Sequence, residues 1–546
     1  MYRFFKFAAP NNGHIEYNGV MKKFLRNLFS GYFLILLVLL LELGLLVTAQ
    51  YFLDNLLETF GIAEGDQLWK LWVALAYVLA KLIVFIVGVI IFFKIISKFE
   101  DPEFKIPWIV SMLLFPFFTS IIFLIFGNHG LRRRDRRIIE ASNNAYASFF
   151  AASCDDQEEA LGNAIGTFRY LQNTTMVGAH HHNRVTYYKN GEEFFPAMME
   201  GLKQAKEFIF IEFFIITDGK LWDETVSILK QKAQEGVDVR IVYDDMGCGG
   251  TISASTPKRL AKFGIKCYKF HPFRPILSGA YNNRDHRKIV VIDHQMAFTG
   301  GCNLADEYAN IITRFGYWKD TMVKIEGSAI NNLIAIFLQN HDLATGKVSD
   351  YLQFLTHDYP VFEEEGFVMP FADAPGSMDN ALVGEQNYIN ILAYAKKKAY
   401  ISTPYLIPTY SLLDALRNAS LRGVEVHLIL PGIPDKKMVY KIAKSHFPYL
   451  LESGVHIHIY EPGFNHMKTA LIDDEIAFVG TINFDFRSLV HHFECGTVLY
   501  KNPCLQVIHD DFEEMLAQSK EIDPAYQLSP SSRRLCALLK IFTPLL

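Results

Sequence analysis

The chain has 546 residues, which is enough for several domains of ordinary size. Hydrophobic residues make up 50% and aromatic residues 14%, which is rich for a soluble protein, and the formal net charge of −5 argues against nucleic acid as a partner. The seven cysteines are scattered and contain no C-x-x-C, which argues against a disulfide framework and a zinc site and favours a reducing compartment.

The first predicted elements are hydrophobic helices. Three apolar runs long enough to cross a bilayer follow a tail over residues 1–30, and Pro116 interrupts the last of them. The runs cover residues 31–53, 68–93 and 106–126. We therefore predict a membrane region over residues 31–127, with two or three hydrophobic helices, and a multi-pass membrane protein.

Two features leave the membrane topology open. Val-Thr-Ala before Gln50 is typical of a signal-peptide cleavage site, but two further apolar runs follow and disfavour that alternative. Basic clusters precede the first run and follow the third, at residues 131–137, and the positive-inside rule places both in the cytoplasm. Three full spans would separate these clusters, so one segment would be re-entrant or interfacial, and the third run is the candidate.

Beyond a basic stretch and linker over residues 128–185, one α/β pattern occurs twice. In the first copy, a strand over 208–216, a helix over 221–236 and a strand over 237–245 are expected. The same order returns in "AYISTPYLI", "SLLDALRNASLRG" and "VEVHLILPG", and "GVDVRIV" aligns with "GVEVHLI". We predict two α/β units related by a pseudo-twofold axis, over residues 186–350 and 351–546, the second with a C-terminal tail.

Both copies carry the same polar motif, H-x-K-x4-D-x6-G-x2-N. The first copy has His286, Lys288, Asp293, Gly300 and Asn303, and the second has His466, Lys468, Asp473, Gly480 and Asn483. One chance match is expected in roughly one of several thousand chains, so two matches within an internal repeat are not accidental. A histidine beside a fixed cation on one strand face is a poor core pair and a good phosphate-handling pair.

The doubled H-x-K-x4-D motif resembles the phospholipase D superfamily. "TPYLIP", "EPGFNHMKTALIDDEIAFVGTINFDFRS" and "HHFECG" resemble, more narrowly, bacterial cardiolipin synthases, and the similarity covers roughly residues 95 to 546. The resemblance implies N-terminal transmembrane helices followed by two phospholipase D-type α/β sandwich units in the bacterial cell membrane. It also implies transfer of a phosphatidyl group between two phosphatidylglycerols to form cardiolipin and glycerol, and it leaves a homo-oligomer open.

The motif residues fit phosphodiester chemistry. One histidine can attack phosphorus while the other protonates the leaving alcohol and later deprotonates the incoming one. Lys288 and Lys468 would bind the non-bridging oxygens, and Asn303 and Asn483 would add neutral donors. We therefore predict that no metal and no other cofactor takes part. The resemblance assigns the nucleophile to the first motif, His286, and the acid to His466, although the motifs alone do not distinguish them.

Four carboxylates have expected roles near these histidines. By resemblance, Asp320 and Glu494 match the acidic positions that orient the two histidines. Asp293 and Asp473 complete the two catalytic His-Lys-Asp motifs, but we expect each to anchor the loop after its strand rather than to contact substrate. The three histidines at residues 180–182 are expected to be a solvated part of the linker.

Three other functions stay open. A phospholipase D, or a phosphatidyltransferase that uses water or another alcohol, would share the catalytic core. A nuclease is disfavoured by the apolar runs and by the lack of net basicity. A catalytically inactive membrane scaffold is disfavoured because both motifs are intact.

Overall fold

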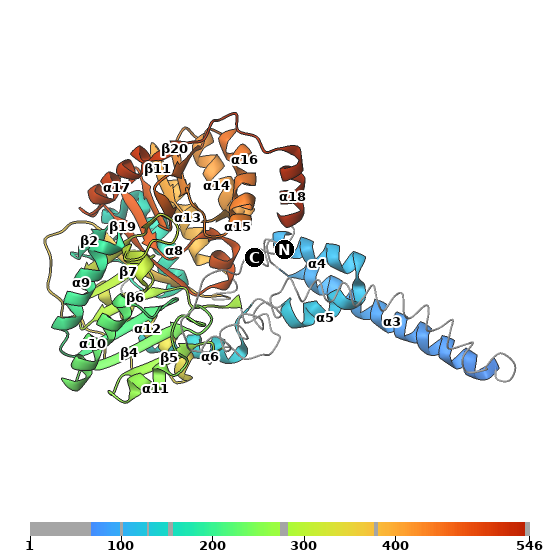
Figure 1. Ribbon diagram of the computed structural model, residues 1–546, viewed down its shortest axis with the longest axis horizontal. Coiled ribbons are helices and arrows are strands. Elements are labelled where there is room, and N and C mark those ends of the chain that lie inside the picture. Colours follow the sequence, from blue (N-terminus) through green and yellow to red (C-terminus); the bar gives the residue numbers. More distant parts are fainter. Residues whose placement is uncertain are drawn as a thin grey trace, which may run out of the picture. The chain divides into compact units, whose positions relative to one another are not determined.

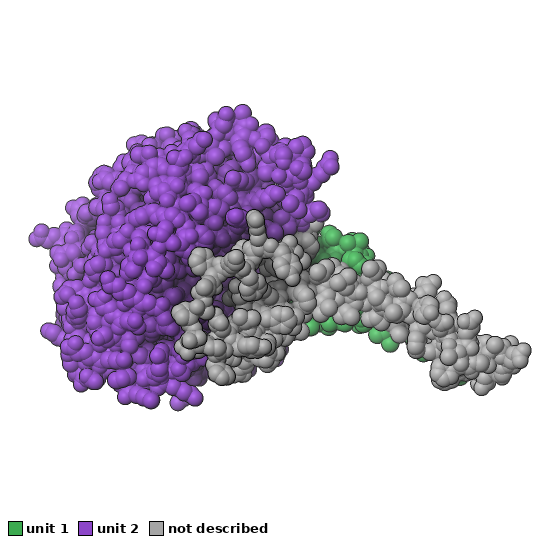
Figure 2. All heavy atoms as spheres, in the orientation of Figure 1, with its two compact units in different colours: residues 1–127, 545 green, residues 128–544, 546 purple. Residues whose placement is uncertain are grey.

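The computed structural model describes residues 67–98, 102–127, 130–150, 157–272, 282–375 and 381–540. The chain divides into two compact units, one chiefly over residues 1–127 and one chiefly over residues 128–544, which Figure 2 distinguishes by colour. The two repeats and their motifs all lie in the second unit.

The described part of the first unit is helical (Figure 1), with helices α3 (Gln67–Ser97), α4 (Pro102–Leu114) and α5 (Pro116–Phe126). The third apolar run becomes α4 and α5, of 13 and 11 residues, because Pro116 favours a helix start. Each is shorter than the bilayer's hydrocarbon core of about 30 Å.

The run over residues 31–53 lies outside the described residues. Among the described residues, no helix combines the length and the apolar character that a membrane crossing requires. The prediction of transmembrane helices is therefore wrong for the part of the chain that can be tested.

The segment over residues 128–185, expected to be a linker, is largely structured. It contains α6 (Arg133–Tyr146), α7 (Glu158–Leu161), α8 (Ile165–Thr175) and the short strand β1 (His180–His181). Ile139, Phe168 and Leu171 belong to the main core. His180 pairs with Asn332 Oδ1 at 2.8 Å and Ser328 Oγ at 3.0 Å. This segment is therefore built into the second unit, and its basic side chains occupy the outer face of α6.

Two sheets with a common strand order form the second unit. The first runs β2-β9-β7-β6-β3-β4-β5, and the second runs β1-β10-β19-β17-β16-β11-β13-β14-β20. The first comprises β2 (Arg184–Tyr188), β3 (Phe208–Phe213), β4 (Asp238–Asp244), β5 (Lys266–Phe270), β6 (Lys288–Ile292), β7 (Met296–Gly300) and β9 (Met322–Glu326). The second adds to β1 the strands β10 (Phe367–Asp373), β11 (Lys398–Ser402), β13 (Glu425–Pro431), β14 (His456–Tyr460), β16 (Thr469–Ile472), β17 (Ile476–Gly480), β19 (Glu494–Tyr500) and β20 (Ser519–Glu521). From β10 to β14 the second sheet repeats the first sheet's order from β2 to β5, so the predicted repeat is confirmed.

Helices follow the strands in both repeats (Figure 1). The first repeat has α9 (Gly191–Gln204), α10 (Lys220–Gln234), α11 (Thr256–Ala261) and α12 (Ile330–Thr345). The second has α13 (Val383–Tyr394), α14 (Tyr410–Leu421), α15 (Lys437–Ala443), α16 (Phe447–Leu451), α17 (Leu505–Ala517) and the terminal α18 (Pro530–Lys540). Polar side chains cap some of these helices; Asn190 Oδ1, for example, accepts the Glu193 N–H at the start of α9.

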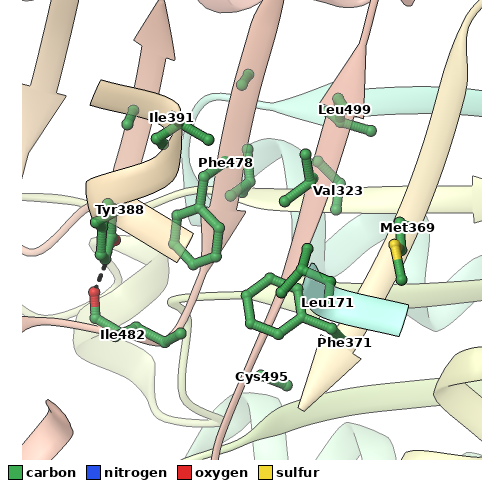
Figure 3. Close-up of a cluster of buried hydrophobic side chains, with 14 of the residues drawn as sticks. Leu171, Val323, Met369, Phe371, Tyr388, Ile391, Phe478, Ile482, Cys495 and Leu499 are labelled. Atoms are coloured by element: carbon green, nitrogen blue, oxygen red, sulfur yellow. Dashed lines mark hydrogen bonds between the residues drawn. The ribbon is translucent and has the colours of Figure 1, made fainter. Parts of the chain in front are cut away.

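One hydrophobic core joins the two sheets. Central strands such as β3, "FIFIEF", are buried on both faces, which suits their aromatic and β-branched composition. Val323 of β9 lies in the same cluster as Phe478 of β17 and Leu499 of β19 (Figure 3). The side chains of α12 are buried from Ile330 to Leu343. The two repeats are therefore packed through a continuous interior rather than joined by a linker.

Short strands also connect the repeats beside the motifs. β8 (Tyr317–Lys319) of the first repeat pairs in parallel with β15 (Gly463–Asn465) of the second. A Cβ at Gly463 would lie 2.3 Å from the Tyr317 carbonyl oxygen, so this crossing requires glycine. Beside the other motif, Asp285 of the first repeat and Phe493 of the second form the corresponding β-bridge. Each motif histidine is thereby placed against a segment of the other repeat.

Candidate active site

The two motif histidines lie where the repeats meet. His286 precedes β6, and its N–H donates to the Phe493 carbonyl oxygen at 2.9 Å. His466 precedes β16, and its N–H donates to the Lys319 carbonyl oxygen at 2.7 Å. Each bond joins one repeat to the other, so the backbone fixes both histidines across the same junction.

The histidine side chains are paired across this junction as well. Nδ1 of His286 lies 3.0 and 2.9 Å from the two carboxylate oxygens of Glu494. Nδ1 of His466 lies 2.6 Å from Oδ2 of Asp320. The structure thus brings together the acids and histidines expected from the sequence, with each acid contributed by the opposite repeat. A carboxylate at Nδ1 favours the tautomer that leaves Nε2 unprotonated and able to accept a proton or attack phosphorus.

The two acids have unequal environments. Glu494 also accepts bonds from the hydroxyls of Thr481 and Ser488. Burial opposes its ionisation, but the charge and hydrogen bond of His286 outweigh this and hold the pKa of Glu494 well below its usual value. For Asp320, burial dominates and raises the pKa to about 6, against the opposing charge of Lys468. Glu494 is therefore the more firmly ionised partner.

The two motif lysines provide buried positive charge. The Nζ of Lys468 lies 2.8 Å from Nδ1 of His466 and 3.8 Å from Oδ2 of Asp320, and Lys288 donates to the carbonyl oxygen of His286. Burial lowers the pKa of each lysine to about 8, so both are largely protonated at neutral pH. This arrangement can stabilise the charge of a phosphodiester and of its transition state.

Burial and the lysine charges lower the pKa of both histidines and so disfavour their protonation before substrate binds. Burial lowers the pKa of His286 to about 3, with Lys288 contributing. Burial, followed by the charges of Lys468 and Lys288, holds the pKa of His466 well below its usual value. An anion placed between the lysines would offset their charge and raise both pKa values, so substrate binding would favour protonation of the acid.

The two asparagines differ from the expected pair of phosphate donors. Nδ2 of Asn303 donates to the Tyr308 hydroxyl at 2.6 Å, and its Oδ1 accepts the Ile215 N–H at 3.0 Å. Asn303 thus positions Tyr308, whose ring centre lies 5.6 Å from that of His466. Oδ1 of Asn483 is buried without a hydrogen-bond partner among the described residues. Of the two asparagine side chains, that of Asn483 is therefore the more available for binding substrate.

The motif aspartates anchor the sheets. The Asp293 carboxylate accepts the N–H groups of Lys206, Glu207 and Phe208, all at 2.8 Å. The Asp473 carboxylate accepts those of Lys396, Lys397 and Lys398, at 2.7 to 2.8 Å. Both aspartates follow the end of the motif strand away from its histidine, at φ 50° and 53°. They tie that strand to its neighbour and do not reach the reacting groups, as we expected for their loops.

A further residue beside the histidines was not identified from the sequence. The His492 ring centre lies 5.3 Å from that of His286, and its Nδ1 lies 3.5 Å from Oε1 of Glu494. Trp318 occupies the corresponding place in the other repeat, 5.6 Å from the His466 ring. Each lies two residues before its acid, and this shared spacing was the available signal.

One group in the described residues has the donor atoms for a metal ion. The ligand atoms of His286, His492 and Glu494 lie within 4.8 Å of one another. In the structure, however, Nδ1 of His286 is hydrogen-bonded directly to Glu494. The expectation that the reaction needs no metal remains a prediction.

Comparison with known proteins agrees with this geometry. The family model "Cardiolipin synthase, PLD-like domain" matches residues 198–335 and 388–516, one segment in each repeat. An uncharacterized protein of Streptococcus mutans is 42% identical over 450 residues, which cover 81% of this chain and 96% of that protein. Cardiolipin synthase 2 of Bacillus anthracis is 34% identical over 442 residues, which cover 80% of this chain and 85% of that protein.

A solved structure shares the fold. The phosphatidylserine synthase of Haemophilus influenzae superposes with a TM-score of 0.52 at 16% identity, covering 70% of this chain and 98% of that one. Together with the doubled motif and its cross-paired histidines, these relatives show that the chain belongs to the bacterial cardiolipin synthase family of the phospholipase D superfamily.

Proposed function

We propose that this phosphatidyltransferase joins two phosphatidylglycerols into cardiolipin and releases glycerol. The observation that carries the proposal is the cross-pairing of His286 with Glu494 and of His466 with Asp320, around two buried lysines. Four polar partners from two repeats thus converge on one site, and the chemistry they support is double displacement at a phosphodiester.

In the first step, Nε2 of His286 attacks the phosphorus of one phosphatidylglycerol. The bond from phosphorus to the head-group glycerol oxygen breaks, and protonated His466 gives its proton to that oxygen. Lys288 and Lys468 stabilise the charge on the non-bridging oxygens. Ionised Glu494 stabilises the cationic phosphatidyl-histidine, and this supports His286 rather than His466 as the nucleophile.

In the second step, His466 removes the proton from the head-group hydroxyl of a second phosphatidylglycerol. That oxygen attacks phosphorus, the bond to His286 breaks, and cardiolipin forms. Both histidines are nearly buried, with 6% exposure of each residue, and Phe214, Trp318 and Tyr308 lie around them. Limited water access favours transfer to an alcohol over hydrolysis, which supports the synthase over a phospholipase D.

The proposed substrates place the reaction at the membrane of a bacterial cell. Lipid analysis after incubation of the full-length protein with phosphatidylglycerol alone tests the proposal. We expect cardiolipin and free glycerol in equal amounts, no product with His466→Ala, and activity that persists in excess EDTA. Phosphatidic acid as the main product would indicate a phospholipase D, and a requirement for one specific metal would refute the metal-free mechanism.

A further inference from the structure

A loop of the second repeat borders the site beside His466. The Tyr405 hydroxyl donates to Asp435 Oδ2 at 2.8 Å and accepts from Lys436 Nζ at 2.8 Å, which fixes the loop. In the same loop, the N–H groups of Gly432 and Ile433 both donate to the Gly463 carbonyl oxygen at 3.1 Å, three residues before His466. The loop therefore lies at the rim of the reaction site, and α15 begins directly after it.

Helix α18 extends this rim. Its buried Cys536 contacts the carbonyl oxygen of Lys441 on α15 at 3.5 Å, so the two helices pack together. Their outer faces carry exposed apolar side chains: Met438 is 61% exposed, Leu535 43% and Leu538 62%. Leu535 and Leu538 are one turn apart on α18 and share a face. Nothing among the described residues covers them.

The apolar rim continues onto the first repeat. Ile311 is 43% exposed and Ile312 is 50% exposed, in the loop before β8. A Cβ at Gly316, in that same loop, would lie 3.0 Å from Cδ1 of Ile433, which is itself 42% exposed. The loop that carries Ile311 and Ile312 therefore meets Ile433 of the second repeat at Gly316, directly before β8.

The charge of this rim is opposite to that of the whole chain. Residues 432–446 and 524–540 contain seven lysines and arginines and a single acidic residue, Asp435, although the net charge of the chain is −5. Lys436, Lys437, Arg533 and Arg534 are exposed. Basic side chains interspersed with exposed isoleucine, leucine and methionine match an anionic bilayer, where the apolar groups enter the interface and the cations contact head groups.

We propose that this rim docks on an anionic lipid bilayer and presents the reaction site to its substrate. The docking rim consists of Ile311, Ile312, Ile433, Met438, Leu535 and Leu538, with the four exposed basic residues Lys436, Lys437, Arg533 and Arg534. The proposal rests on the proposed function, because it explains how a buried site receives a lipid phosphodiester. A polyanion such as nucleic acid would satisfy the charges and leave the apolar side chains in water.

The first test locates the membrane contact in the full-length protein. An environment-sensitive fluorophore is attached at Leu538→Cys and, as the control, at Leu352→Cys, which is 60% exposed and lies outside the rim. With vesicles of phosphatidylglycerol and phosphatidylcholine, the probe at 538 should shift to the blue and be quenched by spin-labelled lipid, and the probe at 352 should not. Equal quenching at both positions, or none at 538, would overturn the proposal. A blue shift at position 538 that appears without vesicles, when the protein concentration alone is raised, would indicate that a second copy of the chain covers the rim instead.

The second test separates docking from chemistry. Arg533→Glu combined with Arg534→Glu should reduce turnover of phosphatidylglycerol in vesicles by at least about tenfold, since each basic residue contributes severalfold to binding an anionic surface. Turnover of short-chain phosphatidylglycerol dispersed in detergent should not change. Lys258→Glu combined with Lys262→Glu, at exposed positions in and directly after α11 of the first repeat, is the matched control and should behave as wild type. Equal losses in vesicles and detergent would refute docking, whereas wild-type protein inactive on both substrates would refute the proposed function.

Discussion

The two repeats share a scaffold and differ in what surrounds each histidine. In both, the lysine of the motif is buried at the start of the central strand, and the aspartate after that strand anchors its neighbour. His286 faces His492 and Phe214, whereas His466 faces Trp318 and Tyr308. The shared scaffold thus places two histidines in equivalent positions, and the different residues around each histidine favour different catalytic roles.

The interior behind the histidines differs even more. The first repeat buries an arginine, Arg287, which donates to the carbonyl oxygens of Glu494, Ile336 and Asp373, next to buried Glu212 and Asp285. Met467 takes the place of Arg287 in the second motif, and Asn465 takes that of Asp285. A buried arginine with two acids thus lies behind the nucleophile that we propose. Behind the acid, the buried ion pair of Lys319 and Asp511 accepts a hydrogen bond from Tyr187, whose hydroxyl lies 3.9 Å from the Met467 sulfur.

Removing either histidine should have the largest effect. We expect His286→Ala and His466→Ala each to reduce turnover by at least about 10⁴-fold, nearly as much as the double variant, because groups that act as a unit are strongly non-additive. Lys468→Ala should reduce turnover by about 10²- to 10³-fold, as expected for removal of one donor that stabilises the transition state. Steady-state assays of folded variants check this. Half the wild-type activity in one histidine variant would mean two independent sites.

Replacement of the two carboxylates that orient the histidines should have unequal effects on catalysis. Glu494→Gln should reduce kcat by about 10³- to 10⁴-fold, comparable to loss of the orienting carboxylate in a catalytic triad. Asp320→Asn should cost at least about tenfold less, since the carboxylate that it removes is less firmly ionised than that of Glu494. Thermal melts of both variants control for folding. Equal losses would contradict the assigned asymmetry.

The buried charge of the first repeat should dominate its stability. Arg287→Met leaves Glu212 and Asp285 without their buried cation, and we expect a loss of about 3–5 kcal/mol in the free energy of unfolding. Met467→Leu, at the matched position, should cost less than about 1.5 kcal/mol. Urea unfolding followed by circular dichroism measures both, and similar values would show that the two interiors are energetically alike.

The pH dependence should be the mildest of these effects. Protonation of Asp320, whose pKa burial raises to about 6, removes an acceptor for His466, so kcat/KM should fall below pH 6. Loss of the lysine charges, with pKa values of about 8, should lower it above pH 8. Asp320→Asn should remove the acid limb and keep the alkaline one. An acid limb that survives in this variant would assign it to another group.

Motif spacing predicted the repeated units because strand alternation and a fixed interval are local properties of the sequence. It could not show that His286 pairs with Glu494 across the repeats, since that depends on how two sheets dock; only the family resemblance pointed to the acids. The same limit hid His492. An apolar run shows that a segment is hydrophobic but not how long its helix is, and Pro116 divides one run into two short helices. Likewise, polar composition predicted a linker in a segment whose Phe168 and Leu171 belong to the core.

The central claim is that both repeats build one site in which His286 carries the phosphatidyl group. Rapid acid-free quenching of a reaction with phosphatidylglycerol labelled at phosphorus, followed by peptide mapping, tests it most directly. We predict label on the peptide that contains His286 and none on the peptide that contains His466, with the labelled enzyme forming cardiolipin when unlabelled phosphatidylglycerol is added. Label on the His466 peptide, or turnover without labelled enzyme and with inversion at phosphorus, would contradict the account.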